Sequence, residues 1–290
     1  MNNKIDHVIL TRFNLPTAGV ESLIRAKEGW LRDRQILFEK YCLPSVKLQT
    51  NQNFSWIIYF DTQSPDWLKK RVSELSASGT FIPIYRDEVS PEDLISDVRS
   101  TRSPDTNILL TTNLDNDDGL SMDFIERLQA SIVDETRTAV YIPVGLIQHD
   151  ANLYLRNDAD NAFCSVSEGW SDPKTCWVDW HNLLHEHMQV KELAGGPGWL
   201  QVIHSGNVSN RVRGRLVSAG SYRSSFAGGL AEIAEPKPLE MLKENLVGIP
   251  MRYLREWGRG LAKKIALLIG GKEALDKIKT SLPMRALIRK

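Results

Sequence analysis

Three carboxylates crowd into the stretch Asp115-Asn116-Asp117-Asp118, directly after the apolar run 107–114. The run is typical of a buried strand, so the acids stand at its carboxyl end. Carboxylates this close repel one another unless a positive group lies among them, and Mg²⁺ or Mn²⁺ takes oxygen ligands from carboxylates and substrate phosphates. The Asp-x-Asp spacing lets two side chains converge on one ion. The turn therefore predicts a Mg²⁺ or Mn²⁺ site for a nucleoside diphosphate.

A solvated turn that caps a helix and an EF-hand calcium loop are the two alternative interpretations of this stretch. Asp and Asn also favour solvated turns and helix caps, and a helix is expected from about Ser121. An EF-hand calcium loop is excluded, because its sixth position needs glycine and Leu120 stands there. A strand rather than a helix also precedes the turn.

The first half of the chain alternates apolar strands with amphipathic helices. We expect strands at 7–13, 54–60, 81–85 and 107–114, and helices at about 20–41, 65–78 and 121–135, with a further helix that starts after Ser90 as its N-cap. This alternation is typical of an α/β fold with a mostly parallel sheet covered by helices on both faces. Ligands bind beyond the carboxyl ends of such strands, where Asp61 and Asp115 stand. Pro83 indicates that its strand lies at the sheet edge.

The second half has a different pattern. We expect strands at 139–149, 151–155, 162–167 and 199–204, a helix over 173–193, and a loop at 218–238. The domain is predicted to span residues 1–238, with a nucleotide-binding half at about 1–135 and an acceptor half at about 136–238. A basic helical tail, residues 239–290, follows.

Composition excludes several classes of protein. The 290 residues carry 36 basic and 36 acidic side chains, so a global nucleic-acid binder is not expected. Three cysteines without a CxxC pair argue against a disulfide scaffold or structural zinc site and favour a reducing compartment. Neither a signal-peptide pattern nor an 18-residue apolar run is present, so we expect a cytoplasmic location.

The charge is unevenly distributed. Residues 251–290 contain eleven Lys and Arg against three Asp and Glu, a net charge of +8, which leaves −8 on the rest. Apolar residues recur at helical spacing between these bases. A basic amphipathic helix binds a membrane surface or a partner, or packs on an acidic body, and both interpretations stay open. The first would place the protein peripherally on the inner membrane face.

Residues 111–118 resemble the DxD segment of GT-A glycosyltransferases, and more narrowly the bacterial putative rhamnosyltransferase family. Similar segments are 7–14, 30–31 with 43–45, 54–61 and 199–207. The resemblance implies a GT-A fold and a metal-dependent glycosyltransferase. It would move a sugar, with rhamnose as one candidate, from a nucleoside-diphosphate sugar to a glycan or lipid-linked acceptor with inversion.

The resemblance also implies site residues. Asp115 and Asp117 would contact the metal and the donor, with Asn116 beside the donor and Asp118 as an outer partner. The residues placed near the nucleotide are Thr11, Arg12, Asn14 and Asp61. His204 would complete the metal shell, although a lone histidine at a strand end is as often simply a polar residue.

The base that activates the acceptor hydroxyl must be a carboxylate or a histidine. Asp179 and His181 lie after the DxD in chain order, where inverting members of the fold place theirs, and Glu168 is the rival. Neighbouring tryptophans either stack on sugars or belong to the core.

Two other functions were weighed. A nucleotidyltransferase would need a glycine-rich phosphate loop after the first strand, and residues 14–19 are poor in glycine. A non-catalytic glycan- or membrane-binding protein would take no nucleotide.

Overall fold

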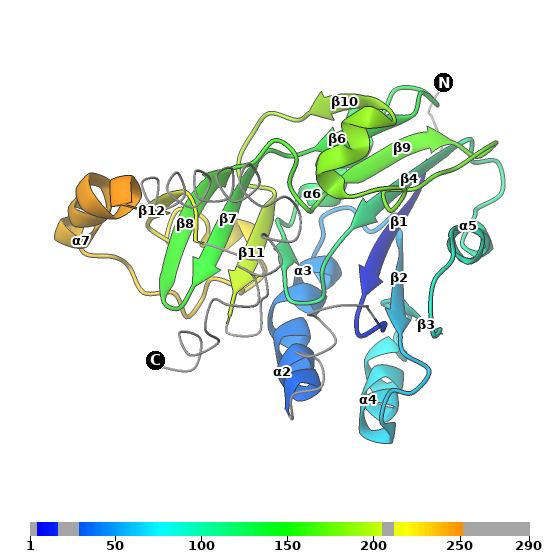
Figure 1. Cartoon of the computed structure of the whole chain (residues 1–290), viewed down its shortest axis with the longest axis horizontal. Coiled ribbons are helices and arrows are strands. Elements are labelled where there is room, and N and C mark those ends of the chain that lie inside the picture. The colour runs from blue at the N-terminus through cyan, green and yellow to red at the C-terminus, as the bar shows by residue number, and fades with distance from the viewer. Residues whose placement is uncertain (1–4, 17–28, 205–211, 252–290) are drawn as a thin grey trace, which may run out of the picture. The chain divides into compact units, whose positions relative to one another are not determined.

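The computed structural model describes residues 5–16, 29–204 and 212–251 (Figure 1). The chain divides into two compact units, Met1–Pro236 and Lys237–Lys290. Part of the predicted helix at 20–41, the segment 205–207 and most of the basic tail lie outside the described residues.

A seven-stranded sheet forms the centre of the first unit (Figure 1). In spatial order its strands are β10 (Gln189–Glu192), β6 (Thr138–Tyr141), β9 (Ser165–Gly169), β4 (Ile108–Asn113), β1 (Ile5–Arg12), β2 (Ser55–Phe60) and β3 (Ile82–Tyr85). The block β4-β1-β2-β3 is parallel, whereas β9 runs antiparallel to both β4 and β6. The predicted α/β class is confirmed, with a mixed rather than purely parallel sheet.

A five-stranded sheet is the second layer of strands. Its order is β12 (Arg215–Val217), β8 (Asn152–Asn157), β7 (Val144–His149), β11 (Trp199–Ile203) and β5 (Gly119–Leu120). Only β7 and β11 pair in parallel. This sheet receives the chain directly after the acidic turn, residues 115–118.

The helices of the first unit connect the strands. They are α2 (Trp30–Leu37), the π-helix η1 (Phe38–Cys42), α3 (Leu43–Lys47), α4 (Asp66–Ser76), α5 (Pro91–Ser100), α6 (Phe124–Ser131), and the 3₁₀ turns η2 (His181–Glu186) and η3 (Arg223–Ser225). Helix α5 begins as its sequence predicts, because Ser90 Oγ accepts from the Asp93 N–H at 3.1 Å and Pro91 follows the cap.

The second unit contains α7 (Pro238–Lys243) and the π-helix η4 (Glu244–Gly248) among its described residues. Across the described parts of both units, no helix has the length and apolar character needed to cross a membrane.

The strands of the first half lie within a residue or two of the predicted ranges, and Pro83 lies on edge strand β3. The helix predicted over 173–193 is wrong. That segment forms an irregular loop, η2 and strand β10. Thr175 has φ +66°, which a helix cannot accommodate, and buried Glu168 binds the backbone N–H groups of Lys174 and Thr175.

Burial explains why β1, β2 and β4 stand where they do. Each is almost wholly enclosed, and Ile9, Ile57 and Leu110 have no exposed surface. Side chains from both faces of these strands therefore contribute to the core, which fixes the positions of the strand ends that carry the polar residues.

His7 is the buried titratable group of β1, and it gives a pH-dependent stability. Its Nε2 lies 2.8 Å from Thr112 Oγ1 and its Nδ1 lies 3.3 Å from Gln129 Nε2. Burial lowers its pKa from 6.5 to about 3. Between these two pH values only the unfolded chain binds a proton at this residue, so stability falls as the pH falls.

We therefore expect His7 to remove about 1.4 kcal/mol of unfolding free energy per pH unit between pH 6 and pH 4. Denaturant titrations at pH 7, 6, 5 and 4 would measure the slope. His7→Gln keeps a donor and an acceptor but does not titrate, so its slope should be smaller by that amount. Parallel slopes for the two proteins would contradict the assignment.

Candidate functional site

The acidic turn links the two sheets at the carboxyl ends of parallel strands. It leaves β4 at Asn113 and enters β5 at Gly119, and β5 pairs antiparallel with β11, which ends one residue before His204. The neighbouring strand β1 ends at Arg12, so its following residues lie at the same edge. Two sheet edges therefore hold the turn in place.

Asp117 is a buried carboxylate of the turn with Arg34 and His204 beside it. The residue is 4% exposed. Its Oδ2 lies 2.5 Å from Arg34 Nη1 and 2.8 Å from His204 Nε2. Although burial opposes ionisation, the hydrogen bond from His204 and the charge of Arg34 lower the pKa of Asp117. The predicted partnership of His204 with this turn is thus a direct contact to Asp117.

Asn116 ties the turn to α2 and to the end of β1. Its Oδ1 accepts from Arg34 Nη1 at 3.1 Å, and its Nδ2 donates to the Phe13 carbonyl oxygen at 2.6 Å. The side chain is buried. Asn116 therefore positions Arg34 and the first strand rather than facing solvent.

Asp118 and Asp115 are the other two carboxylates of the turn. Asp118 is buried, and its Oδ1 accepts from the Val202 N–H of β11 at 2.8 Å. Burial and then the charges of Asp117 and Asp115 raise the pKa of Asp118 well above its usual value. Asp115 is exposed, but the atoms crowded around its carboxylate desolvate it, and with the charge of Asp117 they raise its pKa. Asp115 is the carboxylate of the turn that a ligand reaches from solvent.

The donor set has the chemistry of a Mg²⁺ or Mn²⁺ site. Even so, no group of three or more His, Cys, Asp and Glu side chains in the described part of the chain is arranged to hold a metal ion. Asp117 contacts a guanidinium and an imidazole instead. Mg²⁺ is commonly held by one or two carboxylates together with substrate phosphates. The residues fit an ion whose coordination a bound diphosphate completes.

The predicted nucleotide-binding residues separate into two kinds. Thr11 is fully buried, and its Oγ1 accepts from Trp56 Nε1 at 2.9 Å, so it packs strands and does not reach a ligand. Asn14 accepts from the Asp61 N–H at 3.1 Å and donates to Ser64 Oγ at 3.0 Å. This pair of bonds joins the end of β1 to the end of β2 and sets the position of Asp61.

Arg12, at the end of β1, makes a cation–π contact with Trp177. The Arg12 guanidinium lies 4.0 Å from the centre of the Trp177 ring, and Trp177 Nε1 donates to Asn113 Oδ1 at 2.7 Å. The indole is half-buried. Through Trp177 the loop before η2 reaches Asn113, the last residue of β4, two positions before the acidic turn begins.

Asp179 follows Trp177 by two residues. Asp179 Oδ2 lies 2.8 Å from His187 Nε2, and Oδ1 accepts from the Trp180 N–H at 2.7 Å. The hydrogen bond with His187 lowers the pKa of Asp179. His181 does not join this pair, because its Nδ1 donates to the Asp160 carbonyl oxygen at 2.5 Å.

Glu168 lies far from these residues. It pairs with Leu109 in the register of β4 and β9, four residues before Asn113, which is about 13 Å along the strand. Its carboxylate is 1% exposed, and it accepts from Arg137 Nε at 2.8 Å and from the Lys174 and Thr175 N–H groups. The structure thus does not bring Glu168 to the acidic turn.

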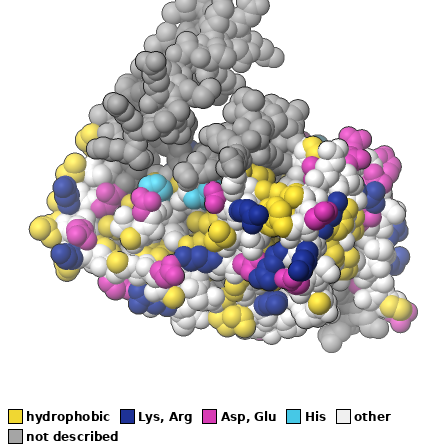
Figure 2. All heavy atoms as spheres, turned by 90° about the horizontal axis from the view of Figure 1, so that it is seen from below, with side chains coloured by type: hydrophobic (Ala, Val, Ile, Leu, Met, Phe, Trp, Pro, Cys, Tyr) yellow, Lys and Arg dark blue, Asp and Glu magenta, His cyan; other side chains and the backbone are white. Residues whose placement is uncertain are grey.

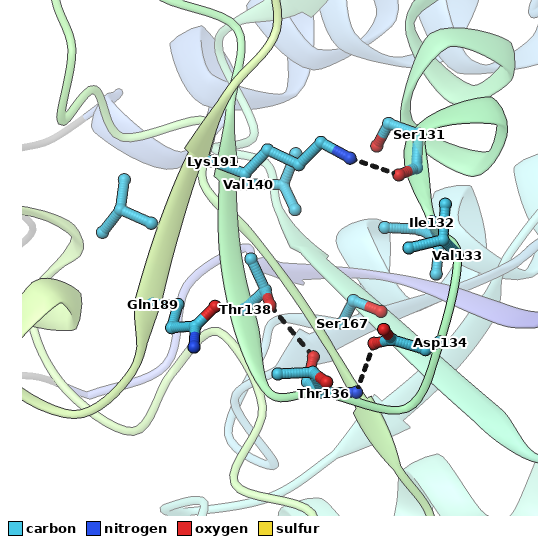
Figure 3. A pocket seen from close by; sticks show the side chains of 11 residues that line it. Ser131, Ile132, Val133, Asp134, Thr136, Thr138, Val140, Ser167, Gln189 and Lys191 are labelled. Atoms are coloured by element: carbon cyan, nitrogen blue, oxygen red, sulfur yellow. Dashed lines mark hydrogen bonds between the residues drawn. The ribbon is translucent and has the colours of Figure 1, made fainter.

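A cavity of about 330 Å³ lies beside β6, β9 and β10 (Figure 3). It is lined by the segment after α6 and by β6, β9 and β10. Lys191 Nζ donates to the Ser131 carbonyl oxygen at 2.6 Å beside it. Strand β9 lies between β6 and β4, so the cavity is separated from the end of β4 by a strand, and none of its lining residues belongs to the acidic turn. We do not assign the donor to it.

Arg34 is the site residue that the sequence did not single out. It lies in an amphipathic helix among other arginines, and only the fold brings it to a turn 83 positions later. Figure 2 shows the underside of the view in Figure 1, where Lys and Arg side chains lie interspersed with Asp and Glu. No continuous basic patch is visible on that face among the residues drawn in colour.

Comparison with known proteins identifies one sequence family. The model of a family described as "Putative rhamnosyl transferase" matches residues 6–216, which include every site residue discussed above. None of the curated proteins matches the chain.

Solved structures with a similar fold are distant in sequence. Staphylococcus aureus TarS 1–349 in complex with UDP has 8% identity and a TM-score of 0.42, and the match covers 68% of this chain and 60% of that one. The Thermotoga maritima inositol-1-phosphate CTP transferase has 10% identity and a TM-score of 0.37 over 69% of this chain and 90% of that one. A putative nucleotide-diphospho-sugar transferase from Desulfovibrio desulfuricans has 12% identity and a TM-score of 0.37 over 78% and 93%. TM-scores this low leave the family assignment to the sequence match.

Proposed function

Because the chain belongs to the "Putative rhamnosyl transferase" family and is a glycosyltransferase, we propose that it moves a sugar from a nucleoside diphosphate to a glycan or lipid-linked acceptor. The observation that carries this proposal is the acidic turn between the two sheets. There Asp117 is buried, ionised and in contact with Arg34 and His204. Rhamnose is the donor sugar that the family description favours.

Transfer from a diphosphate requires stabilisation of the leaving group. When bound, Mg²⁺ or Mn²⁺ supplies this as a Lewis acid. Asp115 and Asp117 are the residues that would hold the ion, with His204 beside them. The exposed carboxylate of Asp115 faces the incoming donor, whereas that of Asp117 is fixed by its neighbours.

The nucleoside end of the donor is assigned to the ends of β1 and β2. Asp61 is half-buried there and is positioned by Asn14. Arg12 is exposed and lies over Trp177, so a cation and an aromatic face are both presented to a ligand at the same edge. These groups suit a base, a ribose or a phosphate next to the acidic turn.

Asp179 is the carboxylate that we assign as base. A base must be ionised before it can accept the proton of the acceptor hydroxyl, and the contact with His187 favours the ionised form. A single displacement assisted in this way inverts the configuration of the sugar.

The test is a panel of UDP-, dTDP- and GDP-linked sugars, including dTDP-rhamnose, incubated with the protein and candidate acceptors. The proposal expects release of nucleoside diphosphate with at least one donor and a glycosylated product. A nucleotidyltransferase would instead release pyrophosphate from a nucleoside triphosphate, and a binding protein would release neither. Either of those outcomes contradicts the proposal.

We also propose that the second unit contacts a membrane surface. Apolar side chains at helical spacing are exposed on α7, η4 and the residues after them: Leu239, Leu242, Leu246, Val247 and Met251. Residues 251–290 follow with a net charge of +8. An apolar stripe next to a basic segment suits an anionic lipid surface, where each basic side chain contributes about 1 kcal/mol.

Removing residues 237–290 is expected to weaken binding to anionic liposomes at least about tenfold while donor hydrolysis continues. Co-sedimentation with phosphatidylglycerol vesicles at low and high salt measures this. Neutral vesicles serve as the control, because the charge contribution is absent there. Equal sedimentation of the full and shortened chains would show that the second unit does not bind the lipid.

A further inference from the structure

Arg34 of α2 contacts two residues of the acidic turn, Asp117 and Asn116. Its Nη1 lies 2.5 Å from Asp117 Oδ2 and donates to Asn116 Oδ1 at 3.1 Å. The side chain is 15% exposed. A guanidinium therefore lies against the carboxylate to which a metal ion is assigned.

The same side chain has an unused donor. Arg34 Nε is buried and has no hydrogen-bond acceptor within the described portions of the chain. A buried unsatisfied donor is costly, and most such groups in folded proteins have a partner. The Trp30 ring lies 5.4 Å from the guanidinium carbon, so an aromatic face, which is a weak acceptor, is the nearby alternative.

A dication and the Arg34 guanidinium on the single carboxylate of Asp117 would leave excess positive charge there. Arg34 Nη1 lies 2.5 Å from Asp117 Oδ2 and His204 Nε2 lies 2.8 Å from the same oxygen, so an incoming ion competes with these contacts. A dication placed on Asp117 would repel the guanidinium strongly at contact distance. A diphosphate supplies the missing charge, and a guanidinium fork matches phosphate oxygens.

We propose that Arg34 is a donor-binding residue that occupies the cation position of Asp117 in the free protein and pairs with the donor diphosphate when donor and metal bind. This rests on the proposed function. The guanidinium neutralises the turn before the donor arrives, and it makes metal binding depend on the nucleotide. Arg34 thereby contacts the leaving group of the reaction.

The experiment measures two affinities for each protein. Mn²⁺ alone is titrated and followed by electron paramagnetic resonance of the free ion, and then UDP and dTDP are titrated separately in the presence of Mn²⁺ by calorimetry. For Arg34→Gln we expect Mn²⁺ alone to bind at least about tenfold more tightly, because its competitor is gone. We expect the nucleotide to bind at least about tenfold more weakly, because a charged contact to phosphate is lost.

Because the affinities for Mn²⁺ and for the nucleotide should change in opposite directions, the result distinguishes donor binding by Arg34 from a purely structural role. If Arg34 only supported the turn, its loss would weaken both affinities. Arg34→Lys retains the charge but not the fork, so Mn²⁺ binding should stay near the wild-type value while nucleotide binding weakens. Arg32→Gln is the matched control, because Arg32 lies on the same helix, is exposed and stacks 4.4 Å from the Trp67 ring. Both of its affinities should be unchanged.

Three outcomes overturn the proposal: Mn²⁺ binding that does not tighten in Arg34→Gln, nucleotide binding that does not weaken, or no Mn²⁺ binding to either protein. A protein that is not a glycosyltransferase would give a different set of affinities. In that case the wild-type protein binds neither nucleotide, and the Mn²⁺ titrations still report whether Arg34 competes for Asp117.

Discussion

Replacing Asp117 by asparagine is expected to lower sugar transfer by about a hundredfold or more, the size of effect seen when one electrostatic catalytic group is removed. Asparagine has nearly the same volume and can still accept from Arg34 and His204. It cannot hold a dication as a carboxylate does, and it leaves the charge of Arg34 without a partner. Initial rates with the active donor would measure the loss.

The variant should remain folded. Losing the charge of Asp117 weakens its pairing with Arg34, but it also removes the repulsion that Asp117 exerts on Asp115 and Asp118. We therefore expect the net change in unfolding free energy to be below about 2 kcal/mol. A thermal melt would confirm that activity is compared between folded proteins.

Two variants serve as controls for Asp117→Asn. Asp118→Asn keeps the acceptor for the Val202 N–H and replaces a carboxyl whose pKa is already raised well above its usual value. Its transfer rate should stay within about threefold of wild type, since Asp118 is buried and its Oδ1 binds the Val202 N–H. Asp134→Asn changes an exposed acid that lines the cavity beside β6, β9 and β10 and should have no effect. If Asp117→Asn turned over as fast as these controls, the acidic turn would not be the donor site.

Residue patterns predict the donor half of this protein well because its signals are local. Strands β1, β2 and β4 are apolar runs buried on both faces, and such runs can be recognised without knowing their neighbours. The placement of Asp115 follows from the end of β4 alone. The acids that lie close in sequence therefore also lie close in space.

The remainder of the site depends on contacts between distant residues. Arg34 reaches Asp117, and β5 is only two residues long and pairs with β11, which neither stretch of sequence indicates. The segment 173–193 has apolar residues at helical intervals. Their backbone instead begins as a loop that Glu168 stabilises by accepting from the Lys174 and Thr175 N–H groups. The apolar spacing therefore predicts a helix where the chain forms a loop, η2 and β10.

Asp179 and Glu168, the two candidate bases, also differ in contacts that their sequence positions do not show. Sequence position favours Asp179 only slightly over Glu168, because Asp179 lies after the DxD in chain order and Glu168 stands at the end of a possible strand. Their surroundings differ completely. Asp179 is linked to the strand ends through Trp177, whereas Glu168 is enclosed near the opposite end of β9 and is bound by Arg137.

Substitution of these residues should therefore give opposite results. Asp179→Asn is expected to lower kcat about a hundredfold, the contribution typical of a general base, with the melting temperature and nucleotide affinity unchanged. The base acts on the acceptor and not on the donor, so calorimetry with the nucleoside diphosphate should not detect the substitution. Donor hydrolysis by water should fall less than transfer to the acceptor.

Glu168→Gln should instead lower stability. It removes the charge that Arg137 and two backbone N–H groups share in a side chain only 1% exposed, and we expect a loss of about 1–3 kcal/mol of unfolding free energy. Below its melting transition the variant should retain most of its kcat. If Glu168→Gln lost turnover with its stability intact while Asp179→Asn remained active, the assignment of the base would be reversed. Because Glu168 is about 13 Å from Asn113 along the strand, that result would also require the acceptor to bind at the other end of the sheet.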